Sequence, residues 1–240
     1  MRSETDELER IGYEIWLAPE VEELDGWRLR HAHGLTGRAN SVWPNGDGLL
    51  PLEEKIDRAE SWYRERSRPP AFQITQAARP PGLDPVLARR GYTVRAAPVS
   101  VQTAALDDVV ERTDGDAELS EELDDAWLEL WAGTRGFDRV DVARALLTGG
   151  RAGFARVDGV AVGRGSIVGE WLGITSMVTL PDARRRGHGR AILHTLAGWG
   201  AEAGCTHALL QVERGNVAAA TLYGRAGFAP HHDYHYRVLS

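Results

Sequence analysis

The segment with the clearest chemical signature covers residues 184–192 and reads RRRGHGRAI. Its two glycines allow the backbone to turn sharply, with several N–H groups pointing the same way. A helix that starts at such a turn adds unpaired N–H groups and the positive end of its dipole. This combination is typical of a phosphate-binding loop, and the arginines supply countercharge. The residues expected to bind phosphate are Arg184, Arg185, Arg186, Gly187, His188, Gly189 and Arg190. His188 is expected to contribute its backbone N–H.

Two familiar phosphate loops do not fit this segment. A dinucleotide-binding G-x-G-x-x-G loop requires a third glycine, where the sequence has Ile192. A P-loop requires a lysine after its last glycine, and the only lysine of the chain is Lys55. An exposed basic helix start is the plainer alternative. The two glycines and the preceding Pro181 favour a binding loop.

The elements around the loop alternate between strand and helix. A strand–turn–strand pattern lies at 153–164, where Asp158-Gly159 is a strong hairpin signal. The periodicity then predicts a long strand, a helix, a strand, a helix and a last strand. Their ranges are 171–180, 189–203, 207–213, 216–226 and 234–239.

The N-terminal half carries its own alternation. Helices are predicted at 4–17, 52–66 and 83–90, and strands or extended chain at 26–30, 72–75 and 92–103. Residues 104–120 are acidic and are interpreted as a linker, followed by a helix from Ser120, its N-cap, to about Trp131, and another at 139–147. The order predicts an α/β (α+β) fold with a mixed central sheet and flanking helices. The expected domains are a smaller α+β domain at 1–110 and a second at 117–240, with a faint repeat between the halves.

Composition excludes several classes of protein. The chain has 240 residues, a net charge of −7 and 42% hydrophobic residues, which is ordinary for a globular protein and unlike a nucleic-acid binder. No apolar run reaches the roughly 20 residues of a membrane span, and the acidic N-terminus does not resemble a signal peptide. The single cysteine, Cys205, excludes an intrachain disulfide and is expected to be buried. A cytoplasmic protein is expected.

Two motifs together resemble the GNAT superfamily of N-acetyltransferases. Arg184-x-x-Gly187-x-Gly189 is similar to its pyrophosphate-binding motif, and the segment from Asn216 to Phe228 is similar to its second motif, N-x-x-A-x-x-L-Y-x-x-x-G-F. Both occur in the family's order, so residues 150–240 resemble the acyl-CoA-binding core. The N-terminal half, through GWRLR and TGRANSVWP, resembles two-part actinobacterial members with a degenerate GNAT-like first half.

The resemblance implies roles for particular residues. In the family, the strand before the loop splays from its neighbour and binds pantetheine, which here implicates the backbone of Met177, Val178 and Leu180. An N–H near Val178 would then bind the acyl carbonyl. Asn216 would contact the CoA arm, and Tyr223 would protonate the departing thiolate as general acid. A buried core tyrosine is the alternative for Tyr223.

The general base is less clearly implied. Histone-type family members carry a glutamate on the long strand at the position of Gly173. An amine must lose its proton before attack, because its ordinary pKa is near 10.4. Glu170 and Glu213 are the carboxylates near this strand, and a water chain to solvent serves equally well.

The sequence therefore predicts an N-acetyltransferase that transfers an acetyl group from acetyl-CoA to a primary amine by direct attack in a ternary complex. The acceptor is a small-molecule amine or a protein amine, with no nucleic acid, membrane or metal involved. The alternative is a non-catalytic acyl-CoA-binding regulatory module. His231, Asp233 and His235 alternate on the last strand, but the histidine content makes a chance cluster the preferred interpretation over a metal site.

Overall fold

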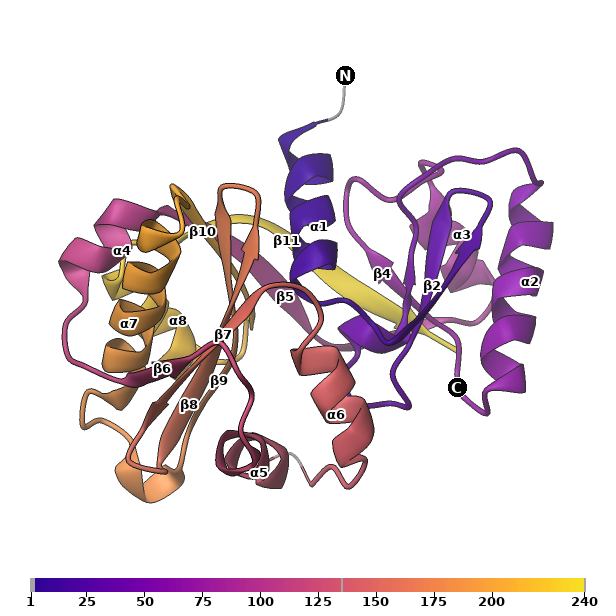
Figure 1. Cartoon of the computed structure of the whole chain (residues 1–240). Helices are drawn as coiled ribbons and strands as arrows, with labels where there is room; N and C mark the ends of the chain where they lie inside the picture. The colour runs from indigo at the N-terminus through magenta and orange to yellow at the C-terminus, as the bar shows by residue number, and fades with distance from the viewer. Residues whose placement is uncertain (1–2, 135, 240) are drawn as a thin grey trace. The chain divides into compact units, whose positions relative to one another are not determined.

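The computed structural model describes residues 3–134 and 136–239 and divides into two compact units. The first unit contains residues up to Arg10, Ala18–Val99 and the chain from His232 onward. The second contains Ile11–Leu17 and Ser100–His231. The helix α1 (Glu4–Ile15) and the strands β5 (Thr93–Ala105) and β11 (Ala229–Val238) therefore have residues in both (Figure 1).

The described strands form one eleven-stranded mixed sheet. The first unit combines part of that sheet with two helices of its own. In it, β1 and β2 form an antiparallel hairpin, and β3 and β4 are parallel. The hydrogen-bonded strand order is β1-β2-β3-β4-β11-β5. Besides the shared strands, its elements are β1 (Glu20–Leu24), β2 (Trp27–His31), the 3-10 turn η1 (Arg38–Asn40), β3 (Val42–Trp43), α2 (Leu52–Glu65), β4 (Ala71–Ile74) and α3 (Leu83–Arg89).

Aromatic side chains form the core of the first unit. Trp27 and Phe72 meet edge to face with ring centroids 5.5 Å apart, and Tyr92 contacts Phe72 at the same distance. α2 contributes its buried stripe, including Ile56 and Tyr63, because residues spaced by three or four positions share one helix face. The unit therefore has an apolar core of its own.

The second unit contains a mixed sheet that positions the candidate site. Its strand order is β11-β5-β10-β9-β8-β7-β6, and β9 and β10 are parallel. Besides the shared elements, it consists of α4 (Leu106–Arg112), β6 (Glu118–Ser120), α5 (Asp125–Gly133), α6 (Val140–Leu147), β7 (Ala152–Val157), β8 (Ala161–Val168), β9 (Trp171–Thr179), the 3-10 turn η2 (Pro181–Ala183), α7 (His188–Glu202), β10 (His207–Glu213) and α8 (Val217–Arg225).

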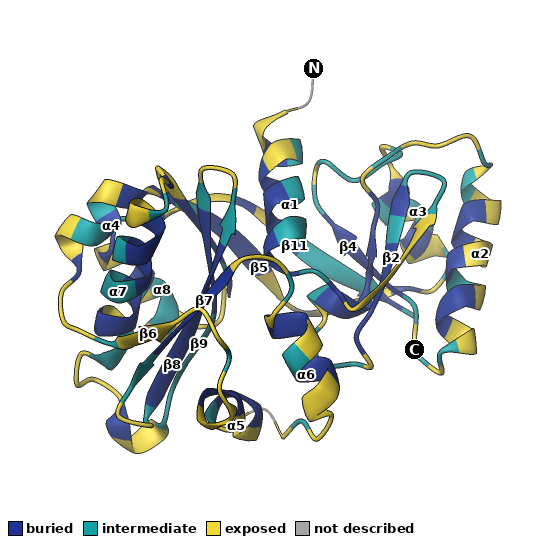
Figure 2. Cartoon of the chain, viewed as in Figure 1, coloured by how far each residue is buried: buried dark blue, intermediate teal, exposed yellow. Residues whose placement is uncertain are grey.

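α7 packs against β7, β8 and β9, and the facing residues are buried (Figure 2). Glycines on β8 make this close approach possible. A Cβ atom on Gly163 would overlap Ile192 of α7, and one on Gly165 would lie 3.0 Å from the Trp199 ring. The helix is therefore held tightly over the strands that carry the site.

The predicted elements are largely confirmed, with two corrections around residue 110. The predicted linker is wrong in part, because Leu106–Arg112 forms α4, whose Leu106 and Val109 are buried. Ser120 is not a helix N-cap, because it ends β6; α5 begins after Asp124, whose carboxylate accepts the Trp127 N–H at 2.7 Å. Serine and aspartate are about equally favoured at this position, so the sequence alone did not distinguish Ser120 from Asp124.

The two compact units are not consecutive pieces of chain, because the C-terminal strand contributes to the first. A division into domains at 1–110 and 117–240, and a duplication of the halves, remain predictions. Across the described ranges, no helix has both the length and the apolar character needed to cross a bilayer.

Candidate active site

β9 and β10 part halfway along their length. Their parallel pairing joins Trp171–Ile174 to His207–Leu210. β9 continues for a further five residues, Thr175–Thr179, and β10 for three, Gln211–Glu213, with no pairing to each other among the described residues. The expected splay is thus present, and it leaves main-chain groups of β9 without a strand partner on that side.

A β-bulge lies where the strands part. The pairing of β9 with β8 runs from Val178↔Val162 to Thr175↔Arg164, so two residues of β9 oppose Gly163. One of the two is Ser176, whose φ of 57° is unusual for a residue other than glycine. Its buried hydroxyl has no hydrogen-bond partner within the described chain. Bulges with such backbone conformations re-aim the strand and are frequent beside active sites.

The ladder with β8 decides which backbone groups of β9 face the opening. The N–H of Leu180 donates to the carbonyl of Val160 at 2.9 Å. Because hydrogen-bonded pairs alternate in an antiparallel ladder, Val178 also faces β8, whereas Thr179 faces the other side. The carbonyl of Thr179 accepts a hydrogen bond from Nε of Arg184, which agrees with this alternation. The expected N–H donors at Val178 and Leu180 are therefore engaged in the sheet, while Met177 lies in the bulge, where the regular alternation is interrupted.

The glycine loop forms a nest of N–H groups at the start of α7. Arg185 and Gly187 both have positive φ, 62° and 90°, and Gly187 is the N-cap of the helix. The Gly187 carbonyl accepts the N–H groups of Arg190 and Ala191. The N–H groups of Gly187, His188 and Gly189 have no acceptor among the residues described. A loop of this conformation at a helix N-terminus suits a phosphate oxygen.

The arginines of the loop differ in their availability. Arg184, Arg185 and Arg186 are exposed at the loop. Arg190 instead pairs with Asp114, with Nε and Oδ1 2.7 Å apart, so its charge is partly compensated from outside the loop. The positive charge facing a ligand therefore comes mainly from the residues before Gly187.

Gly189 brings the loop close to α8. A Cβ atom at this position would lie 3.1 Å from Cδ2 of Leu222, so the glycine allows the start of α7 to approach α8. α8 begins after Asn216, whose side-chain oxygen accepts the Ala219 N–H at 3.1 Å. The exposed amide nitrogen of Asn216 remains directed outward as a donor, since the oxygen is used for the cap.

Tyr223, two turns along α8, is 7% exposed and lies against Phe228 with ring centroids 6.0 Å apart. Burial raises the pKa of Tyr223 to about 12. The phenol is therefore protonated at neutral pH, and no described residue hydrogen-bonds to it. A protonated, partly accessible hydroxyl is able to donate a proton to a strong acceptor, although the side chain also belongs to the core.

The paired half of β9 is sealed. A Cβ atom on Gly173 would overlap the side chain of Ile15, in the last turn of α1, whose Cγ2 lies 2.7 Å from that position. Arg164, on β8, holds this turn in place: its guanidinium donates to the carbonyls of Ile15 at 3.0 Å, Leu147 at 2.5 Å and Gly149 at 2.9 Å. A carboxylate on this strand position therefore has no room.

The two candidate bases lie at different heights along β9. The β9–β10 register of Trp171 opposite His207 places Glu213 at about the level of Met177, across the opening. Glu170 precedes β9, about seven residues or ~23 Å from Met177 at 3.3 Å per residue. Its carbonyl accepts the N–H groups of Thr206 and His207, so it organises the far end of the sheet.

The histidines of β11 lie outside this candidate site. His232 is buried against Glu9, with Nε2 and Oε1 2.8 Å apart. His235 pairs with Asp84. No group of three potential metal-ligating side chains occurs in the described part of the chain. Cys205 is buried, as predicted, and burial raises the pKa of its thiol.

Sequence reasoning missed the bulge at Ser176, the contact of Ile15 with Gly173 and the role of Arg164. The one available signal was the position of Arg164 in a predicted strand. The structure shows that this arginine is buried, and charged residues are rarely buried without partners.

Comparison with known proteins agrees with this geometry. Residues 2–237 match the family described as "Probable histone acetyltransferase Rv0428c C-terminal". An uncharacterized N-acetyltransferase of Bacillus subtilis, YobR, is 27% identical over 96% of this chain and 97% of its own length. Probable histone acetyltransferase Rv0428c of Mycobacterium tuberculosis is 28% identical over 95% of this chain and 72% of its own length.

Solved structures support the fold. A GCN5-related N-acetyltransferase from Kribbella flavida has a TM-score of 0.66 at 16% identity and covers 98% of this chain and 93% of its own. A tandem GNAT protein from the clavulanic acid biosynthesis pathway has a TM-score of 0.58 at 12% identity, over 83% of this chain and 74% of its own. With the family model matching nearly the whole chain, the protein belongs to the Rv0428c C-terminal family and is a GNAT-fold N-acetyltransferase.

Proposed function

We propose that the protein transfers an acetyl group from acetyl-CoA to a primary amine by direct attack in a ternary complex. The observation that carries this proposal is the combination of a splayed β9, a nest of free N–H groups at Gly187–Gly189 and a protonated Tyr223. Each part suits one portion of the thioester substrate: the pantetheine arm, the pyrophosphate and the sulfur.

The residues present fit acetyl-CoA as a substrate. The N–H groups of Gly187, His188 and Gly189 would hold the pyrophosphate, with the Arg185 and Arg186 side chains as countercharge. The main chain of Met177 and Thr179 would pair with the pantetheine arm at the open edge of β9. The outward amide of Asn216 would donate to the same arm.

The chemistry then follows from the positions along β9. The amine nitrogen attacks the thioester carbon, the carbonyl oxygen becomes an oxyanion, and the Met177 N–H stabilises that charge. After attack the nitrogen carries a positive charge and releases a second proton to water. As the C–S bond breaks, Tyr223 donates its proton to the sulfur, so that the products are an amide and a free thiol. Tyr223 regains a proton from solvent before the next turnover.

The amine must lose one proton before attack. Because the Gly173 position is filled by Ile15, a carboxylate within β9 cannot serve. We propose that the exposed Glu213, across the opening from Met177, accepts this proton directly or through water. Glu170 has no part in the proposed mechanism, because it lies at the far end of the strand.

The acceptor is a cationic amine, which a chain of net charge −7 attracts electrostatically. The name of the Mycobacterium tuberculosis relative supports inclusion of a protein lysine among the acceptors. Small polyamines and peptide N-termini complete the classes that the mechanism accommodates, since all present a primary amine.

Titration calorimetry with acetyl-CoA tests the cofactor half of the proposal, with dephospho-CoA and desulfo-CoA as controls. Release of free thiol in the presence of histone-tail peptides, N-terminal peptides and small amines tests the transfer half. We expect binding of acetyl-CoA and thiol release that depends on one acceptor class. Binding without thiol release for any amine would contradict the transferase mechanism, and absence of binding would contradict the assignment of the loop.

A further inference from the structure

A second cluster of polar side chains lies in the first unit, where the end of β2 meets the C-terminal end of α2. It comprises His31, His33 and Arg68, and none of the three takes part in the proposed acetyl transfer. The ring centroids of the two histidines are 4.5 Å apart, at an interplanar angle of 87°. We refer to these three residues as the His31 cluster.

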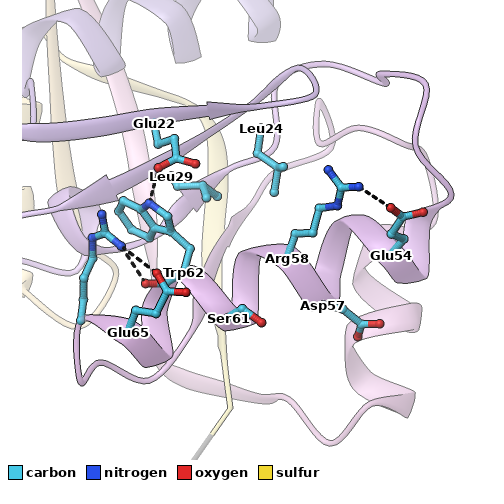
Figure 3. Close-up of a pocket in the computed structure, with 10 residues that line it drawn as sticks. Glu22, Leu24, Leu29, Glu54, Asp57, Arg58, Ser61, Trp62 and Glu65 are labelled. Carbon is cyan, nitrogen blue, oxygen red and sulfur yellow. Dashed lines mark hydrogen bonds and ion pairs between the residues drawn. The ribbon is translucent and has the colours of Figure 1, made fainter.

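His31 is the central residue, because it is 4% exposed and both of its ring nitrogens are buried without a hydrogen-bond partner among the described residues. A buried imidazole normally has at least one partner, since leaving a polar group unsatisfied costs free energy. On its other side, His31 meets Trp62 with ring centroids 6.3 Å apart. Trp62 donates from Nε1 to Glu22 at 2.7 Å, so its one polar atom is directed elsewhere (Figure 3).

Arg68 supplies a permanent positive charge to the same place. Its Nε is buried, and no described acceptor lies within hydrogen-bonding distance of it. The backbone N–H of Arg68 donates to the Tyr63 carbonyl and that of Ser67 to Arg64, which is the Schellman arrangement at a helix end. Ser67 has a φ of 52° where this motif usually has glycine. Ser67 thus adopts an unfavourable backbone conformation in the turn that positions Arg68.

The loop after β2 makes room for that guanidinium. A Cβ atom on Gly34 would overlap Nη2 of Arg68 and would lie 2.7 Å from its Cζ. The side-chain oxygen of Asn40 accepts the N–H groups of both Ala32 and Gly34 at 2.9 Å. His33, between them, has a φ of 49° and is exposed. The Asn40 side chain thus fixes the loop in an uncommon conformation, in which His33 lies against His31 and Arg68 lies against Gly34.

The charges that face His31 favour an anion. Arg66 and Arg68 act on it as positive groups, and Glu20 as the negative one. Glu20 is already paired with Arg66, whose Nε lies 2.7 Å from Oε1 and whose guanidinium stacks 3.7 Å from the Trp62 ring centroid. Burial lowers the pKa of His31, so the ring is neutral at pH 7 without a ligand and presents one N–H donor.

We propose that the His31 cluster is a binding site for a small oxyanion group, such as a phosphate or a carboxylate of a ligand. Arg68 binds two of its oxygens through the guanidinium, and the N–H groups of His31 and His33 donate to the others. His33 is exposed and Arg68 is half-buried, so the cluster reaches the surface of the unit through these two side chains. The site lies within the first unit and is independent of the glycine loop.

Histidine signals in nuclear magnetic resonance spectra of the full chain test this site directly. The Cε1–H resonances of His31 and His33 are assigned with His31→Gln and His33→Gln, and the protein is titrated with sodium phosphate in a phosphate-free buffer. A parallel titration with sodium acetate separates a phosphate ligand from a carboxylate ligand. We expect saturable shifts of both resonances with at least one of these anions.

Arg68→Gln should weaken that affinity about tenfold, because a charge-assisted pair is lost. Arg64→Gln is the matched control: it removes the same charge from an exposed position of α2 and should leave the affinity unchanged. Absence of a saturable shift with either anion, or equal affinity in the Arg68→Gln and Arg64→Gln variants, would overturn the proposal.

Discussion

The two halves of β9 belong to one strand and have opposite properties. Along Trp171–Ile174 the strand is paired on both sides, and Gly173 has no space for a side chain beside Ile15. Along Thr175–Thr179 it has lost its parallel partner, carries a bulge at Ser176 and exposes main-chain groups. The first half excludes a ligand and the second half offers hydrogen bonds to one.

This difference shows where catalytic groups are available. Side chains of the sealed half face packed neighbours, so the proposed mechanism uses the main chain of the open half, the glycine loop and α8. Arg164 contacts both halves of β9. It anchors the turn that covers Gly173, and its Nη1 lies 3.5 Å from Oγ1 of Thr175, where the open half begins. Four substitutions test the contrast.

Gly187→Glu, in the glycine loop that follows the open half of β9, should have the largest effect. A carboxylate in the nest of N–H groups would repel the pyrophosphate, so we expect loss of acetyl-CoA binding, by roughly a thousandfold or more, in titration calorimetry. Folding should persist, since a Cβ atom there has no neighbour closer than 3.9 Å.

Two controls separate the causes of that loss. Gly198→Glu adds the same charge further along α7, at a position whose Cβ meets nothing within 4 Å, and should bind normally. Gly187→Ala isolates the strain of a positive φ. Normal binding by Gly187→Glu would remove the loop from the site.

Tyr223→Phe should lower kcat by a factor of about 10²–10⁴, the usual contribution of a general acid, with little change in acetyl-CoA affinity. Because burial raises the pKa of Tyr223 to about 12, the phenol stays protonated as the pH rises from 7 to 10. Any alkaline loss of activity in this interval therefore has another origin and should be the same in both proteins. Unchanged kcat in Tyr223→Phe would leave this side chain with a core role alone.

Gly173→Glu tests the sealed half. The new side chain would overlap Ile15 and bury a charge, so we expect a loss of about 3 kcal/mol in the free energy of unfolding and a Tm lower by about 6–12 °C. Gly173→Ala should cost less, and Ile15→Ala in the same chain should restore part of that loss, as a double-mutant cycle would measure. A stable Gly173→Glu protein with raised kcat would mean that this half of β9 is accessible after all.

Glu213→Gln should have the smallest effect, about a tenfold lower kcat, because the residue is exposed and water can replace a carboxylate there. Glu170→Gln, at the sealed end, is the matched control and should retain full kcat. Steady-state rates with a saturating acceptor provide the comparison. Equal rates in both variants would assign the proton transfer to solvent, and a larger loss in Glu170→Gln would reverse the roles of the two ends.

Local signals explain how much of the site was predictable. Glycine at 187 and 189, the N-cap at Asn216 and the spacing to Tyr223 are properties of short segments, and their elements formed as expected. The donors on β9 were not predictable in detail, because which backbone groups face outward depends on the register with β8. A single bulge changes that register, and no short sequence pattern specifies it.

The errors near residue 110 have a similar cause. Leu106–Arg112 contains three acidic residues and reads as a polar linker, yet Leu106 and Val109 pack into the core of the second unit. Helix formation there depends on that burial more than on intrinsic propensity. The opposite case is the Asp158-Gly159 turn, where both residues have positive φ and the turn chemistry alone predicted the hairpin.

The sequence by itself determined the alternation of elements, the glycine loop and the polar residues of α8, because each depends on interactions within a few residues of chain. Tertiary structure decided that Gly173 lies under Ile15, that Arg190 pairs with Asp114, and that Arg68 lies against Gly34. Residues far apart in sequence make these contacts, and only the packing of the folded chain brings them together.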